Sequence, residues 1–218
     1  MDGRAVIFDL DGTLVDSLDD IAGALGAAFV ELGLAAPGRD AVRAWVGDGA
    51  RALVARAVHA AGRDDLDVDE VHAVFRGHYR AAPVVHSHLY DGVAAALDAI
   101  AAAGVPMAVL SNKPHDLTTV VAAALLSRWR FRAIEGHRPG GPLKPDAGAA
   151  AALLAALGVP AAACTMIGDS VVDVAFARAA GLRAIAVTWG LQPRAALVAA
   201  APDRLLERTA ELADAVLA

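Results

Sequence analysis

Two acidic residues lie close together near the start of the chain, in the segment FDLDGTLVDS (residues 8–17). Asp9 and Asp11 follow the apolar run 5–8, so on an extended strand their side chains would lie on the same side. Two carboxylates at that spacing repel each other unless a cation lies between them. The segment, which continues with Gly12 and Thr13, is therefore either a solvated turn or a site that binds a cation.

Further polar residues follow later apolar runs. Ser111, Asn112 and Lys113 come directly after the run 107–110, whereas Asp169 and Asp173 come after the run 164–167. Lys113 and Lys144 are the only lysines among 19 basic residues, and each directly precedes a proline. A compact ammonium group differs from a flat guanidinium in reach and geometry, so both lysines are candidates for roles that arginine cannot fill. The alternative is that lysine occupies these two positions by chance.

The apolar runs predict buried strands, because each is too short for a helix. The segments between them have helical spacing, and Gly104, Gly158 and Gly181 follow three of these segments as stop signals. This alternation predicts an α/β fold with a doubly wound parallel sheet, a Rossmann-like core. The predicted strands are residues 5–8, 107–110, 131–134, 164–167 and 184–187, and the predicted helices are residues 92–103, 116–126, 146–157 and 171–180.

The alternation is interrupted once, between residues 16 and 86. This stretch has no strand-like run, and its apolar residues recur at helical spacing. We expect residues 16–86 to form an inserted α-helical domain, with residues 1–15 and 87–218 forming the catalytic core. The linkers would be residues 14–18 on the way out and 84–90 on the way back.

Ligands of open α/β sheets bind outside the carboxyl ends of the strands, so the polar residues after each strand should converge. Several carboxylates at one point need a cation, and hard oxygen ligands suit Mg²⁺. Ser111, Asn112 and Lys113, at the start of a helix, suit the oxygens of a phosphoryl group. A carboxylate nucleophile beside a metal and a phosphate implies an aspartyl-phosphate intermediate.

Four segments together resemble the four motifs of the haloacid dehalogenase superfamily, in its phosphatase branch. They are FDLDGTLVDS, LSNKP, LKPD and IGDSVVD, in this order, and the similarity covers essentially the whole chain. The phrases WVGDGARALVARAV (45–58), LYDGV and VTWG (187–190) are similar to the phosphoglycolate phosphatases of that family. The resemblance implies a phosphatase of small organic phosphate monoesters, with 2-phosphoglycolate as the expected substrate.

The resemblance also implies a role for each matching residue. Asp9 would attack phosphorus, and Asp11 would protonate the leaving oxygen and later take a proton from water. Lys144 would balance the charge on the transferring group. Asp9, Asp169 and the backbone carbonyl of Asp11 would hold Mg²⁺, with Asp173 positioning a water or Lys144. Phosphate-binding roles would fall to Gly12, Thr13, Ser111, Asn112 and Lys113.

The inserted domain would be the family's helical cap, which closes over the site and selects the leaving group. Arg51 could bind the carboxylate of a small substrate, although an ordinary turn before a helix is an equal alternative. Asp48 replaces the asparagine that close relatives usually carry. It would repel a carboxylated substrate if it faced the site, so this position bears on the substrate and not on the chemistry.

The net charge and the composition limit the kinds of partner that we expect for this chain. The net charge of −6 gives no basic surface for nucleic acid or for an anionic membrane. The single Cys164 lies in an apolar run, which favours a buried hydrophobe over a reactive thiol. The amino-terminal residues lack a secretion-signal pattern, so we expect a cytoplasmic protein. We further expect a monomer or a homodimer whose partner is a small phosphorylated metabolite.

Other functions remain open at this point. Pyrophosphate or a sugar or nucleotide-derived phosphate could be the substrate instead. A dehalogenase would lack an acid at position 11, and related phosphonate hydrolases and phosphomutases use a cap lysine that residues 16–86 do not contain. A phospho-accepting receiver module would have no helical insert, and a silent binding protein would have lost some of these polar residues.

Overall fold

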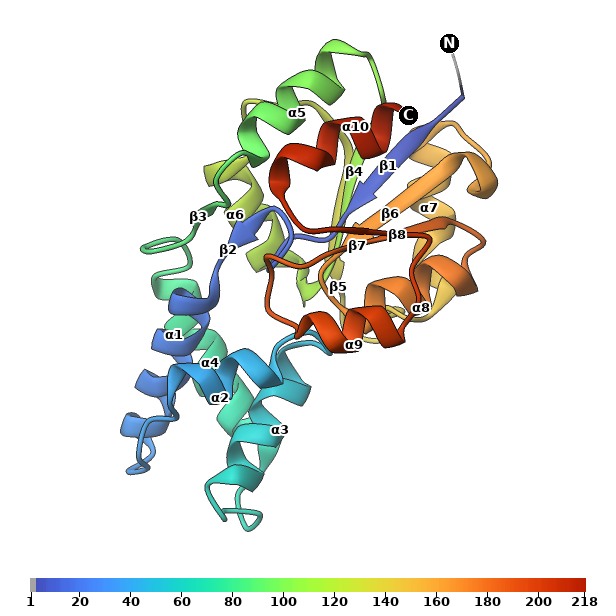
Figure 1. Cartoon of the computed structure of the whole chain (residues 1–218). Helices are drawn as coiled ribbons and strands as arrows, with labels where there is room; N and C mark the ends of the chain where they lie inside the picture. The colour runs from blue at the N-terminus through green and yellow to red at the C-terminus, as the bar shows by residue number, and fades with distance from the viewer. Residues whose placement is uncertain (1–2) are drawn as a thin grey trace.

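The structure, a computed structural model, describes residues 3–218. Its centre is a six-stranded parallel sheet with the strand order β5-β4-β1-β6-β7-β8 (Figure 1). The predicted α/β core with a doubly wound parallel sheet is therefore confirmed. The strands are β1 (Ala5–Phe8), β2 (Val15–Asp16), β3 (His88–Leu89), β4 (Met107–Pro114), β5 (Phe131–His137), β6 (Cys164–Gly168), β7 (Arg183–Val187) and β8 (Arg204–Leu206).

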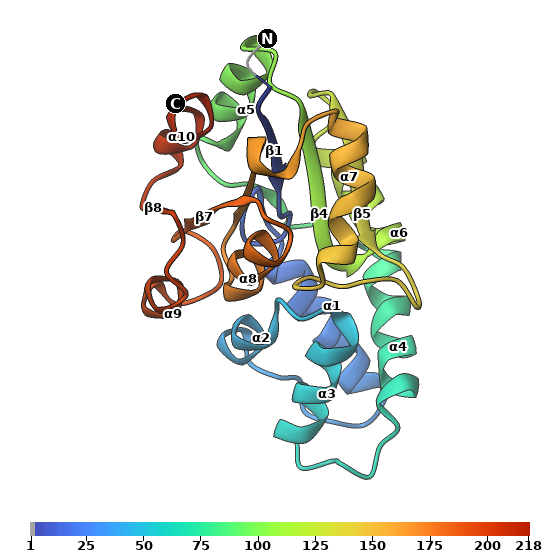
Figure 2. The same cartoon turned by 90° about the vertical axis from the view of Figure 1, so that its right-hand side faces the viewer.

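Helices cover both faces of this sheet, because side chains along each strand alternate between the faces. Val6 and Phe8 of β1 pack on one side with α5, α6 and α10, whereas Ala5 and Ile7 pack on the other side with α7, α8 and α9 (Figure 2). These helices are α5 (Val93–Ala102), α6 (His115–Leu125), α7 (Ala150–Leu157), α8 (Val171–Ala179), α9 (Arg194–Ala199) and α10 (Leu212–Leu217).

Four further helices form a separate unit that lies beyond the carboxyl edge of the sheet (Figures 1 and 2). They are α1 (Leu18–Glu31), α2 (Arg39–Trp45), α3 (Ala50–Ala60) and α4 (Val68–Ala81). Their apolar faces enclose a core of their own, which includes Leu25, Phe29, Val54 and Phe75. We call this unit the cap; it occupies the stretch in which the sequence predicted an inserted helical domain.

A short antiparallel ribbon joins the cap to the sheet. Val15 of β2 pairs with Leu89 of β3, and Asp16 pairs with His88. The ribbon therefore brings the outgoing and the returning chain together at one place. None of the helices formed by residues 3–218 has the length and apolar character that a membrane crossing requires.

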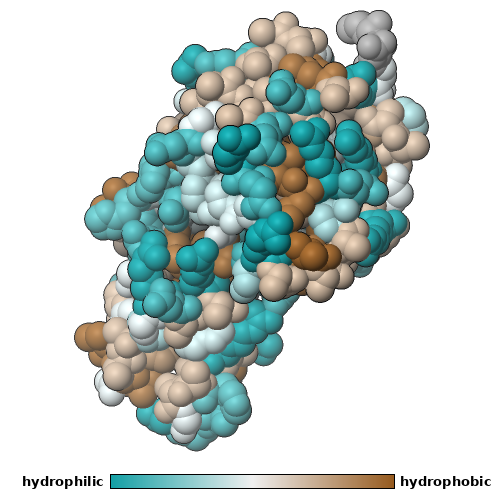
Figure 3. Space-filling view, in the orientation of Figure 1, coloured by the Kyte–Doolittle hydropathy of each residue, from teal (hydrophilic) through white to brown (hydrophobic). Residues whose placement is uncertain are grey.

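Exposed apolar side chains are found at the far end of the cap. Val30 and Leu32 lie at the end of α1 and remain 65% and 38% exposed. The space-filling view shows hydrophobic residues at this end of the cap, whereas the surface over the sheet carries both hydrophilic and hydrophobic residues (Figure 3). The site described next lies at the other end of the cap, where it meets the carboxyl edge of the sheet.

Candidate active site

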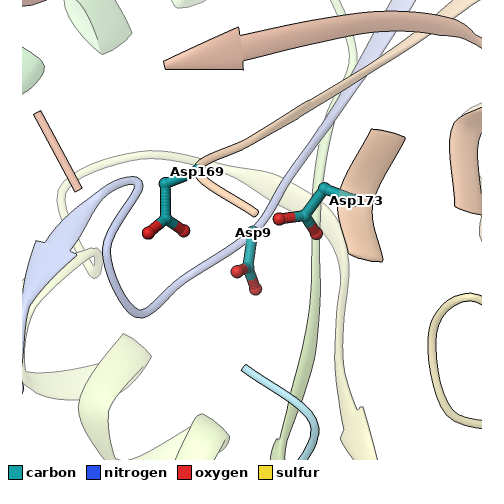
Figure 4. Close-up of side chains that lie close together, drawn as sticks. All are labelled: Asp9, Asp169 and Asp173. Carbon is teal, nitrogen blue, oxygen red and sulfur yellow. The ribbon is translucent and has the colours of Figure 1, made fainter. Parts of the chain in front are cut away.

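Three aspartates from two sheet strands and one helix converge at the carboxyl edge of the sheet. Asp9 follows β1, Asp169 follows β6, and Asp173 lies in the first turn of α8. Their side chains lie close together (Figure 4), and one oxygen of each lies within 4.8 Å of the others. All three are buried. The predicted convergence of Asp9, Asp169 and Asp173 is thus present in the structure.

Burial and mutual repulsion make this cluster unfavourable when it is fully ionised. Burial raises the pKa of Asp9 to about 7, an effect that Lys144 opposes and Asp173 reinforces. Burial and the charges of Asp9 and Asp173 raise the pKa of Asp169 to about 8. The cluster therefore needs either protons or a cation, and this arrangement of carboxylate oxygens suits a divalent metal ion.

Lys144 supplies one positive charge to the cluster. Its Nζ lies 2.9 Å from Oδ1 of Asp9 and 2.6 Å from Oδ1 of Asp173, and it donates a hydrogen bond to the Leu110 carbonyl at 3.0 Å. Burial alone would lower the pKa of Lys144, but the two carboxylates outweigh it and raise that pKa. One ammonium among three carboxylates leaves an excess of negative charge. Oδ1 of Asp9 is also buried, and the Lys144 ammonium is the cation that it faces among the described residues.

Glycines let the backbone approach Asp169. Gly12 has a φ of +85°, and a Cβ at this position would lie 2.3 Å from Oδ2 of Asp169. A Cβ at Gly190 would lie 2.3 Å from the Asp169 Cβ. Because neither position can carry a side chain, the Leu191 N–H reaches Oδ2 of Asp169 at 2.7 Å, and Thr13 donates to Oδ1 at 3.3 Å.

Asp173 is held by the start of its own helix. The Ser170 hydroxyl donates to Oδ2 of Asp173 at 2.5 Å, and the Ser170 N–H donates to the same oxygen at 3.1 Å. The Asp173 N–H in turn donates to the Ser170 hydroxyl oxygen at 3.2 Å, and this bond completes a capping box with the Ser170 N–H bond at the N-terminus of α8. Oδ1 of Asp173 is thereby left to face Lys144.

Asp11 is held apart from the three clustered aspartates. The Ser17 hydroxyl donates to its Oδ1 at 2.5 Å, and Nζ of Lys113 lies 3.0 and 3.1 Å from its two carboxylate oxygens. The Asp11 side chain does not belong to the cluster of Asp9, Asp169 and Asp173, the carboxylates among the described residues that could hold a metal ion. Asp9 and Asp11, although two residues apart, therefore have different surroundings.

A cavity with a volume of about 60 Å³ lies between the sheet and the cap. The core contributes mostly polar groups to its wall, whereas Ile21, Leu53 and Phe75 of the cap give it an apolar side. Predicted residues that line it are Asp9, Asp11, Ser111, Asn112, Lys113 and Asp169. The site can therefore enclose a small organic group between polar and apolar walls.

Asn112 links the lysine loop to the cap. Its Oδ1 accepts from the Lys144 N–H at 2.8 Å, and its Nδ2 donates to the carbonyls of Lys144 at 3.0 Å and Gly47 at 3.1 Å. With these bonds, Asn112 positions Lys144 and does not point freely at a phosphoryl group. Ser111 accepts only from the Lys113 N–H within the described part of the chain, so its hydroxyl hydrogen remains available.

The structure does not bring Arg51 to this cavity. Arg51 is exposed on α3, where it pairs with Asp69 of α4 through bonds of 2.6 and 3.2 Å. Asp48 pairs with Arg56 and does not line the cavity either. Asp48 and Arg51 both line a neighbouring cleft between cap and core, outside the cavity that Asp9 and Asp11 line.

Sequence reasoning missed Tyr79, Leu191 and Gln192, which also line the cavity. Tyr79 continues the four-residue spacing of Val71 and Phe75 along α4, and that periodicity could have placed it on the buried face. Leu191 acts through its backbone N–H, so its side-chain type carries no signal. Gln192 follows the VTWG phrase, and only the fold brings it to the site.

Comparison with known proteins agrees with this geometry. Residues 4–181 match the family model described as haloacid dehalogenase-like hydrolase. The phosphoglycolate phosphatase of Yersinia pseudotuberculosis is 35% identical over 215 residues, which cover 98% of this chain and 93% of that protein. The phosphoglycolate phosphatase of Rhodospirillum rubrum is 38% identical over 193 residues, covering 86% of this chain and 80% of that protein.

Solved structures share the whole architecture. The crystal structure of a predicted phosphoglycolate phosphatase from Haemophilus somnus superposes with a TM-score of 0.90. It is 27% identical, and the match covers 97% of both chains. The sheet and the cap of this chain are therefore both similar to those of that protein.

Proposed function

Because the chain belongs to the haloacid dehalogenase-like hydrolase family and is a phosphoric monoester hydrolase, we propose that it hydrolyses 2-phosphoglycolate with Mg²⁺ through a phosphorylated Asp9. The observation that carries the proposal is the separation of two neighbouring carboxylates. Asp9 lies in the cluster with Asp169 and Asp173, whereas Asp11 is held by Ser17 and Lys113. This division suits a nucleophile beside a proton donor.

The residues present fit a divalent cation. Asp9, Asp169 and Asp173 outnumber the single ammonium of Lys144, which leaves the cluster with an excess of negative charge. Asp9 and Asp169 would hold Mg²⁺ directly, and Asp173 would orient Lys144. When bound, Mg²⁺ would neutralise part of the charge on the phosphoryl oxygens.

The proposed reaction has two displacements. In the first, an Asp9 oxygen forms a bond to phosphorus while the bond to the leaving oxygen breaks, and that oxygen takes a proton from Asp11. In the second, Asp11 takes a proton from water as the water oxygen attacks phosphorus. Inorganic phosphate then leaves and Asp9 is regenerated.

Neighbouring groups support both displacements. Lys144 offsets the negative charge that accumulates between Asp9 and the phosphoryl group, and the Ser111 hydroxyl can donate to a phosphoryl oxygen. Gly12 lets the chain pass beside Asp169 without a side chain in the way. The apolar cap wall excludes bulk water from the bond that breaks.

The substrate assignment rests on the relatives. Relatives named phosphoglycolate phosphatase are 35% and 38% identical to this chain. The alternative is a phosphatase of pyrophosphate or of a sugar or nucleotide-derived phosphate, since no arginine lines the cavity among the described residues.

A panel of phosphorylated metabolites, assayed with and without Mg²⁺, tests the proposal. We expect kcat/KM for 2-phosphoglycolate to exceed the other values by at least about tenfold, or about 1.4 kcal/mol, and activity to require Mg²⁺. A smaller preference would overturn the assignment of 2-phosphoglycolate as the substrate. Asp9→Asn should abolish phosphate release while the matched variant Asp19→Asn, at an exposed position, stays active. Full activity of Asp9→Asn would overturn the proposal that Asp9 is phosphorylated during the reaction.

A further inference from the structure

One cap side chain makes a direct polar connection to the proposed proton donor. The hydroxyl of Tyr79, on α4, accepts a hydrogen bond from Nζ of Lys113. The same Nζ lies 3.0 and 3.1 Å from the two oxygens of Asp11. Tyr79, Lys113 and Asp11 therefore form a chain of contacts that runs from the cap into the core.

This chain of contacts is buried at its centre. The Lys113 side chain is 3% exposed and the Asp11 side chain 10%. Burial alone would lower the pKa of Lys113, but Asp11 and Tyr79 outweigh that effect and raise it. Lys113 therefore stays charged and is limited to these partners, because water is excluded from it.

The position of Tyr79 is fixed by packing within the cap. Its ring lies 5.8 Å from the Phe75 ring one turn earlier on α4, and the Lys113 ammonium lies 4.4 Å from the Tyr79 ring centre. A buried hydroxyl without a partner would cost about 1–3 kcal/mol, so the cap packs well against the core only where Lys113 meets this hydroxyl. The direction of the Lys113 ammonium thus depends on where the cap lies.

We propose that Tyr79 is a positioning residue that orients Lys113, and through it Asp11, for proton transfer to the leaving oxygen. The inference rests on the proposed function and adds a residue to it. Proton donation by Asp11 becomes efficient only when the cap is in contact with the core. Premature transfer in an open site is thereby disfavoured.

The proposal makes a specific prediction about leaving groups. When the bond between phosphorus and the leaving oxygen breaks, that oxygen keeps the electron pair and takes the Asp11 proton. A p-nitrophenolate ion leaves readily without that proton, whereas a more basic phenolate ion depends on it more strongly. A residue that only positions Asp11 should therefore matter in proportion to the basicity of the leaving group.

The experiment compares Tyr79→Phe with the wild type on phenyl phosphate and p-nitrophenyl phosphate. Phenyl phosphate is the smaller of the two, so it fits wherever p-nitrophenyl phosphate fits. We expect kcat/KM for phenyl phosphate to fall at least about tenfold and that for p-nitrophenyl phosphate to change less than about threefold. Because kcat/KM covers the steps up to departure of the leaving group, it isolates the step in which Asp11 donates.

The chain's only other tyrosine supplies the matched control. Tyr90 follows the ribbon strand β3 and does not line the cavity, so Tyr90→Phe should leave both values unchanged. Equal losses on both substrates, or no loss, would overturn the proposal. The ratio of the two values is independent of the folded fraction, so partial unfolding of Tyr79→Phe does not obscure the result. A wild-type enzyme that releases phosphate neither from these esters nor from 2-phosphoglycolate would instead overturn the proposed function.

Discussion

Asp9 and Asp169 carry the largest electrostatic cost in the site. Burial and repulsion raise the pKa of Asp9 to about 7 and that of Asp169 to about 8, although Lys144 partly offsets the first. In the folded protein without metal, both groups bind protons more tightly than in the unfolded chain. Proton binding by Asp9 and Asp169 therefore contributes fully to the free energy of unfolding below the ordinary carboxyl pKa. This contribution is lost as the pH rises through about 7 and 8.

This linkage predicts how pH changes the stabilisation by Mg²⁺. Protons and metal ions compete for the same oxygens, so Mg²⁺ should raise Tm more at about pH 8.5 than at about pH 5.5. Thermal unfolding at the two pH values, with and without Mg²⁺, measures the effect.

The matched variant is Asp169→Asn, which removes one of the two carboxyl groups with a raised pKa and one proposed metal ligand. It should reduce both the Mg²⁺ effect and its dependence on pH. Equal stabilisation by Mg²⁺ at both pH values, or undiminished stabilisation of Asp169→Asn, would contradict the assignment of the metal site.

Candidate site residues that directly follow a strand could be predicted from the sequence. Asp9, Asp169 and Lys144 could be predicted because carboxylates and rare lysines after apolar runs must gather at one edge of a parallel sheet. Arg51 could not be judged in this way, because its direction depends on its pairing with Asp69 across two cap helices. Tyr79 and Lys113 meet 34 positions apart, and no local pattern indicates that contact.

At the scale of elements, Asp20 does more than place a negative charge in the first turn of α1. It is buried, and its carboxylate accepts hydrogen bonds from the N–H groups of Val85, His86 and Ser87 and from the Ser87 hydroxyl. Burial would raise the pKa of Asp20, but these hydrogen bonds outweigh it and lower that pKa. Asp20 thus fastens the returning linker to α1.

We expect Asp20→Asn to destabilise the protein by about 3 kcal/mol, because an amide nitrogen would face backbone N–H groups that have lost their acceptor. The neighbouring Asp19 is the matched control. Its side chain is 54% exposed and pairs with Arg39, so Asp19→Asn should cost less than about 1 kcal/mol. Urea unfolding of both variants measures the difference, and equal costs would refute the role of Asp20.

Elements that carry a clear apolar pattern could be predicted from the sequence, although their bounds were not always correct. β1 has the predicted bounds, but β4 continues through Pro114, so Ser111, Asn112 and Lys113 lie within the end of the strand. Of the predicted helix 146–157, only Ala150–Leu157 is α-helical. β8, α9 and α10 span three to six residues each, too few to show a period, and tertiary packing stabilises them.

At the scale of the whole molecule, the active site is shared between two units. The sheet supplies the charged groups, and the cap supplies an apolar wall together with the hydroxyl of Tyr79. The inserted helical stretch was predictable because it interrupts the strand pattern, but its approach to the core was not. That approach depends on Asn112, which bonds Gly47, and on Tyr79, which bonds Lys113.

The central claim is that this molecule transfers a phosphoryl group to Asp9. Rapid quenching during turnover of 2-phosphoglycolate with Mg²⁺, followed by borohydride reduction, converts a phosphorylated aspartate into homoserine, which peptide mass spectrometry locates. The account predicts homoserine at position 9 in the presence of both substrate and Mg²⁺, and none when either is omitted. Homoserine at another aspartate, or a fully active enzyme with none at position 9, would contradict it.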